Sequence, residues 1–159
     1  MADNFLKIEE IKGESQDDKH RDEIEILSWS FDEANSESLS SESGGNAGKV
    51  VMQDFKFVAP VSKASPLIFI AVASGQHYPE AILTVRKSGG DQVDFLKWTL
   101  SDIFFSSWGE ARQDDGTRPL DSFSINFAKI EMEYKVQNPD GSLGPPVRRG
   151  WDLKQAKAF

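Results

Sequence analysis

The feature that most constrains this chain is an uncharged apolar run within residues 62–86. Ser65 and Pro66 are typical of a helix start, because a serine oxygen can accept hydrogen bonds from the first free amides and proline fits the first turn. Residues 67–73 carry no charge, and Gly75 suits the left-handed position at which many helices end. The sequence therefore predicts a helix over about residues 63–75. Water cannot surround so apolar a helix, so we expect a sheet, a neighbouring subunit or both to cover it.

The rest of the chain shows strand patterns. Apolar and polar residues alternate over residues 80–87, and a Ser-Gly-Gly-Asp turn at 88–91 leads into a long strand from residue 93 to about residue 105. Further strands are predicted over residues 4–11, 23–32, 49–58, 123–136 and 147–153. About seven strands joined mostly by hairpins, with one helix, predict a mainly β fold. The expected architecture is an antiparallel β-barrel or tight two-sheet barrel with one flanking helix.

Two of the predicted strands change their apolar face halfway. In strand 23–32, Ile24 and Ile26 share one face, whereas Leu27, Trp29 and Phe31 lie on the other. Side chains alternate with a period of two, so both sets can reach one core only if the strand is bulged or bent. The longest strand changes face in the same way, which is typical of strands that turn a barrel corner.

Two polar segments separate the strands. Residues 33–49 contain few hydrophobic residues and many serines and glycines, which predicts a long extended loop or a protruding hairpin. Residues 108–119 are predicted to form a second polar loop. A length of 159 residues suits one domain with a sizeable core, so we expect residues 1–159 to form a single domain.

The composition narrows the choice of partners. A net charge of −8 argues against nucleic acid or an anionic membrane as a partner. The absence of cysteine excludes a disulfide framework and a thiolate metal site. The N-terminus lacks a basic-then-apolar signal pattern, and no apolar run approaches the roughly 20 residues that span a bilayer. We therefore expect a cytoplasmic protein without membrane insertion.

No motif carries a recognisable catalytic or cofactor-binding pattern. The GESQD segment at residues 13–17 lacks the second glycine and the strand-to-helix context of a nucleophile elbow. The GGNAGKV segment at residues 44–50 departs from a phosphate loop in its glycine spacing and in the valine that follows its lysine. His20 and His77 lie in polar turns and read as solvated side chains. We expect no enzyme activity, no cofactor and no metal.

The tryptophans leave one alternative open. Trp29, Trp98 and Trp151 lie within strand patterns and are expected in the core, whereas Trp108 lies at a loop edge where it could be exposed. Exposed aromatic rings on a β-sandwich can stack against sugars. A monomeric module that binds carbohydrate or another ligand is therefore the alternative function.

Short segments in a characteristic order run through the whole chain. They are IKGES (11–15), EIEILSWS (23–30), GKV (48–50), QDF (53–55), KASP (63–66), SGQH (74–77), AILTVRKSGG (81–90), SINFAKI (124–130) and GWD (150–152). In this order they resemble the Hcp family, the inner-tube protein of the bacterial type VI secretion system. The resemblance implies a homo-hexameric ring that stacks into a tube and leaves the cell without a signal peptide. Implied partners are further rings, the spike, the sheath and baseplate, and effector proteins carried and stabilised in the ring lumen.

Site residues follow from the helix and from the resemblance. The uncharged helix face is expected in the subunit interface, through Leu67, Phe69 and Ile70. The extended loop of the family implies ring stacking through Gly44, Gly45 and Gly48. If strand alternation holds, Ser30 faces the lumen and contacts an effector, although a small residue turned to water would show the same pattern.

Overall fold

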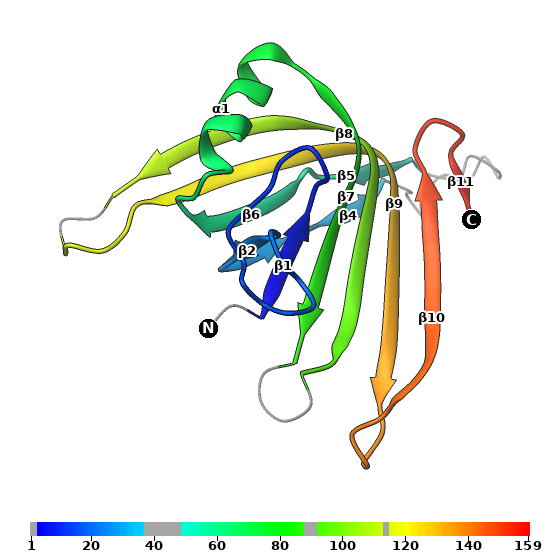
Figure 1. Ribbon diagram of the computed structural model, residues 1–159. Helices are drawn as coiled ribbons and strands as arrows, with labels where there is room; N and C mark the ends of the chain where they lie inside the picture. The colour runs from blue at the N-terminus through cyan, green and yellow to red at the C-terminus, as the bar shows by residue number, and fades with distance from the viewer. Residues whose placement is uncertain (1–2, 37–48, 88–91, 113–114) are drawn as a thin grey trace.

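A nine-stranded antiparallel sheet forms most of the fold, and helix α1 (Ser65–Ser74) flanks it (Figure 1). The computed structural model describes residues 3–36, 49–87, 92–112 and 115–159. The strands of this sheet are β1 (Asn4–Lys7), β2 (Ile24–Ile26), β3 (Ser28–Ser30), β6 (Phe55–Pro60), β7 (His77–Arg86), β8 (Asp94–Ala111), β9 (Leu120–Gln137), β10 (Leu143–Asp152) and β11 (Lys157–Ala158). A separate hairpin pairs β4 (Glu33–Asn35) with β5 (Val50–Met52). The predicted mainly β class with a flanking helix is confirmed.

The two longest strands, β8 and β9, turn a corner together. Leu100 pairs with Ile130 and Ile103 pairs with Phe127, and all four side chains are buried. Leu100 and Ile103 are three positions apart, so the inward face must switch between them. The switch falls at Asp102, whose φ is 51°. The predicted change of face in the longest strand is thus a real bend, and both strands run across it (Figure 1).

The sheet is not closed, which corrects the barrel expectation. Its strand path ends at β2, while β3 pairs with β6, which pairs in turn with β9. Only Leu27 separates β2 from β3, and its backbone N–H donates to the Val58 carbonyl at 2.8 Å. The face of the strand changes at this residue. Leu27 is 51% exposed, whereas Trp29 and Phe31, predicted on the same face, are half-buried against the core.

The second predicted polar loop begins too early. Strand β8 continues through Trp108 to Ala111 and stays paired with β9, after a register shift between Phe105 and Ser107. A bulge of this kind adds one residue to a strand without ending it. The bulge and the polar residues around it hide the strand alternation in the sequence.

The predicted position of the helix is confirmed, but the prediction that the Ser65 side chain caps it is wrong. The helix begins after Ala64, and Ser65 donates a hydrogen bond to the buried carboxylate of Asp121 on β9. Gly75 ends the helix in the left-handed conformation, with φ of 68°, as predicted. Ile68 and Ala71 face the sheet and are buried, which anchors α1 on β8.

Candidate assembly surfaces

The outer side of α1 is an exposed apolar ridge. Leu67, Phe69 and Ile70 are 43%, 52% and 53% exposed, and we call these three residues the helix ridge. The Phe69 ring packs edge-on against Trp108, with centroids 5.4 Å apart, so the ridge rests on the end of β8. The sheet covers only one side of the helix. The expectation that something else covers the remainder stays a prediction.

A hollow on another side of the molecule is also apolar. Residues of hairpin β4–β5 and of β8, β9 and β10 together line a groove of about 380 Å³. We call it the apolar groove, and its lining is Phe31, Glu33, Asn35, Val50, Met52, Trp98, Ile130, Met132, Arg149, Gly150 and Trp151. Of these residues, Met132 is 40% exposed and Arg149 is also exposed. The groove therefore opens to solvent through a mainly hydrophobic lining.

Apolar exposure continues beyond the groove along β9 and β10. Tyr134 and Val147 are cross-strand partners and are 41% and 58% exposed, and Val136 is 51% exposed. Contiguous apolar surface of this kind marks a site of protein association. The chain thus exposes apolar residues on the helix and again on the β9–β10 side.

The predicted lumen residue lies on a polar part of the sheet surface. Ser30 is exposed on β3 and pairs with Lys56 of β6, which is exposed as well. Farther across the sheet, Ser106 donates a 2.5 Å hydrogen bond to Asp54, and Ser106 and Ser124 lie 2.7 Å apart. The exposure of Ser30 agrees with contact to another molecule and equally with contact to water.

The predicted stacking residues Gly44, Gly45 and Gly48 lie outside the described residues. The chain on either side of them is described, because Asn35 of β4 pairs with Val50 of β5. The ends of the predicted long loop are therefore held together as a hairpin base. None of the three predicted sites is brought into contact with another within the described parts of the chain.

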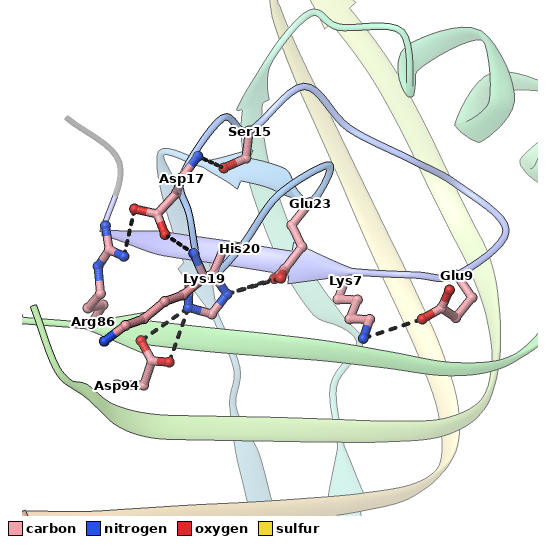
Figure 2. A network of polar contacts seen from close by, with 9 residues as sticks. All are labelled: Lys7, Glu9, Ser15, Asp17, Lys19, His20, Glu23, Arg86 and Asp94. Atoms are coloured by element: carbon pink, nitrogen blue, oxygen red, sulfur yellow. Dashed lines mark hydrogen bonds and ion pairs between the residues drawn. The ribbon is translucent and has the colours of Figure 1, made fainter.

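A polar network ties the loop between β1 and β2 to the sheet (Figure 2). His20 is buried, with Nδ1 3.0 Å from Glu23 Oε2 and Nε2 3.1 Å from Asp94 Oδ2. Arg86, also buried, forms an ion pair with Asp17 at 2.7 Å. Burial raises the pKa of Glu23, and the nearby His20 partly opposes that rise. The expectation of a solvated His20 is wrong, because the groups that bury it come from distant parts of the sequence.

Over residues 3–36, 49–87, 92–112 and 115–159, no group of three or more histidine, aspartate or glutamate side chains is arranged to hold a metal ion. In the same residues, no helix is both long enough and apolar enough to cross a membrane.

Sequence reasoning found the helix ridge but missed the groove. The ridge lies on one continuous apolar segment, whereas the groove collects residues from five strands between Phe31 and Trp151. No periodicity within one strand marks such a surface. The one signal for it in the sequence is that Met132, Tyr134 and Val136 alternate with charged residues and so share one face of their strand.

Comparison with known proteins gives a consistent result. The family model described as "Type VI secretion system effector, Hcp" matches residues 5–134. Protein hcp1 of Pseudomonas aeruginosa is 40% identical over 156 residues, which cover 97% of this chain and 96% of that protein.

Solved structures agree with the sequence match. Hcp1 from Salmonella typhimurium superposes with a TM-score of 0.81 at 35% identity, with all of both chains covered. A structure described as that of a type six secretion system protein has a TM-score of 0.93 at 26% identity, again over all of both chains. The family model covers most of the chain and the relatives cover nearly all of it, so this chain belongs to the Hcp family of type VI secretion proteins.

Proposed function

We propose that this chain is the structural subunit of a type VI secretion tube, in which six copies form a ring and rings stack into a tube that is secreted. The observation that carries the proposal is the helix ridge, because Leu67, Phe69 and Ile70 expose apolar surface that the chain itself does not cover. Membership of the Hcp family makes the chain a type VI secretion protein. Its function in that system is to assemble, and no catalytic step is proposed.

In this proposal, three different surfaces of the subunit make the contacts of the assembly. The helix ridge lies in the contact between neighbouring subunits of a ring. The segment with Gly44, Gly45 and Gly48 contacts the next ring, and the paired ends of β4 and β5 support it. Ser30 faces the lumen, where effector proteins are carried and stabilised. The spike and the sheath and baseplate are the remaining partners.

A monomeric ligand-binding module is the alternative function. It depends on an exposed aromatic platform, and Trp108 was the candidate. Trp108 is half-buried and packs against Phe69. All four tryptophans are half-buried against the hydrophobic core, which weakens this alternative.

Light scattering on the size-exclusion peak, with negative-stain images of the same fraction, tests the ring. A mass near six times the 17.7 kDa subunit, together with annular particles, is the expected result. A monomer at physiological salt would overturn the proposal. Tryptophan fluorescence during titration with sugars would then test the ligand-binding alternative.

Charge substitution tests whether the segment with Gly44 and Gly45 contacts the next ring and not the neighbouring subunit of the same ring. Replacing Gly44 with aspartate and Gly45 with lysine should weaken the stacking of rings and leave single rings intact. Electron microscopy counts stacked and single rings at equal protein concentration. Rings that dissociate in this variant would show that the segment holds the ring itself together.

A further inference from the structure

We infer that the helix ridge of one copy packs into the apolar groove of the next copy. The inference rests on the proposed ring and names the two surfaces that meet in it. It concerns Leu67, Phe69 and Ile70 on one side of the contact, and chiefly Val50, Met52, Met132 and Trp151 on the other.

Symmetry requires two different surfaces. A ring is closed by a head-to-tail contact, in which one patch of each subunit meets a different patch of its neighbour. The described chain offers such a pair, because α1 and the β10–β11 edge lie on different sides of the molecule (Figure 1). Each subunit can therefore present its ridge to one neighbour and its groove to the other.

The shapes of the two surfaces match. The ridge is convex, with Phe69 and Ile70 more than half exposed. The groove is concave, and its volume of about 380 Å³ is enough to take a few such side chains from a partner. Contact would remove apolar surface from water on both sides, and this is the main favourable contribution to association.

Charge favours one orientation of the helix in the groove. The C-terminal end of a helix carries a partial negative charge, and residues 71–74 contain no basic side chain to offset it. The N-terminal end already has the carboxylate of Asp121 beside Ser65. Arg149 and Glu33 both line the groove and are exposed, so the C-terminal end of α1 is favoured beside Arg149 and disfavoured beside Glu33. The C-terminal end of α1 should therefore point towards Arg149 of the neighbouring copy.

Pairing of two ridges is the competing arrangement. It would join two copies about a twofold axis and stop at a dimer, with both grooves still open to solvent. The ridge-in-groove contact covers both surfaces and can continue from copy to copy. The two arrangements differ in the products that cross-linking gives.

Disulfide cross-linking tests the contact directly, because the chain contains no cysteine of its own. The variant carries Ile70→Cys and Met132→Cys, both at exposed positions. After oxidation, a denaturing gel without reductant should show a ladder of bands that ends at six subunits. Each single-cysteine variant should remain monomeric on that gel.

Matched controls separate the possible outcomes. Ile70→Cys combined with Lys19→Cys, an exposed position outside the groove, should give no ladder. Dimers from Ile70→Cys alone would show ridge pairing and overturn the inference. If the variant with Ile70→Cys and Met132→Cys forms rings by light scattering but gives no ladder, the inference is also overturned, and the proposed ring would stand. If the wild-type protein is a monomer, both the proposed ring and the ridge-in-groove contact are overturned.

Complementation gives a second readout that needs no cross-link. Phe69→Asp removes the ridge and Met132→Asp closes the groove, so each variant alone should be monomeric. Mixed at equal concentration, they should form a dimer of twice 17.7 kDa, because one intact ridge and one intact groove remain and the chain cannot grow further. A mixture that stays monomeric in sedimentation velocity would contradict the pairing.

The orientation has its own test. Arg149→Glu should lower the ring fraction by about tenfold or more, because it places a negative charge beside the negative end of the helix. Lys19→Glu makes the same change of charge outside the groove and should leave the fraction unchanged. Equal losses in the two variants would show that only net charge matters.

Discussion

The imidazole of His20 lies flat against the ring of Phe5, with centroids 4.5 Å apart and 6° between the planes. Each imidazole nitrogen faces a carboxylate, Nδ1 at Glu23 and Nε2 at Asp94. Both carboxylates can accept hydrogen bonds from the ring nitrogens. This contact fastens the loop between β1 and β2 to the beginning of β8 (Figure 2).

Removing the donors of His20 should destabilise the fold. His20→Phe keeps an aromatic ring against Phe5 but leaves the nearly buried Glu23 carboxylate without its partner. We expect a loss of roughly 2–4 kcal/mol in the free energy of unfolding, measured in urea. His77→Phe, at a histidine whose side chain is 62% exposed, should change it by less than about 0.5 kcal/mol. A His20→Phe variant as stable as the parent would show that the stacking alone holds the loop.

Acid should abolish the contribution of Glu133. Hydrogen bonds from Arg148 hold the pKa of this carboxyl below its ordinary value of 4.5, with help from the charge of Lys97. A carboxyl whose pKa is depressed by folding stabilises the folded state above about pH 4.5, and the stabilisation is lost as the pH falls through the folded-state value. Glu133→Gln should therefore cost about 1–2 kcal/mol at pH 7, a modest value because Arg148 is half exposed.

The pH dependence separates this charge effect from packing. The difference between the parent and Glu133→Gln, taken from urea titrations at several pH values, should shrink steadily below pH 4.5. Glu80→Gln, at an exposed position on β7, should show a small difference at every pH. A cost of Glu133→Gln that stayed constant down to about pH 3, well below the ordinary carboxyl range, would contradict the assignment.

The sequence predicted the elements whose patterns are local. The helix was placed correctly because its apolar run and terminal glycine are both contiguous, and the structure has α1 at Ser65–Ser74. The changes of face in two strands were also visible, because a shift in alternation is a local signal. Their structural setting required the three-dimensional structure: the switch in β9 lies opposite Asp102 of β8, which has a positive φ, and the switch in the other strand lies at the interruption at Leu27.

What failed depended on contacts across the fold. Ser65 read as a helix cap, but its hydroxyl donates instead to Asp121, 56 residues away. His20 read as solvated, but Asp94 comes from a strand 74 residues later. The strand end beyond Phe105 was hidden because a bulge breaks the alternation at Ser107. Single-sequence patterns cannot reveal partners that lie this far along the chain.

Replacing Gly75, the glycine that ends α1, should lower the stability of the fold because of its backbone conformation. Gly75 has φ of 68°, and an added Cβ would meet no atom within 4 Å. Gly75→Ala should therefore destabilise the fold by about 1 kcal/mol through backbone strain alone. Gly109→Ala is the matched control, since that site is equally open and has no positive φ, and it should be nearly neutral. Equal urea midpoints for the two variants would contradict this explanation.

The side chain of Phe159 packs directly on a second glycine, Gly150. Gly150 exchanges two backbone hydrogen bonds with Phe159, each of 3.0 Å, and an added Cβ would clash with the Phe159 ring. The ring is therefore seated on the glycine backbone, beside the short pairing of β10 with β11.

Gly150→Ala should displace this ring and loosen the C-terminal strand. We expect a loss of about 1–3 kcal/mol in the free energy of unfolding and faster hydrogen exchange at the Phe159 amide. Phe159→Ala removes the clash, so the double variant should be less destabilised than the sum of the two single variants. Strictly additive losses would show that the ring and the glycine do not interact, and that the alanine acts on the β10 backbone instead.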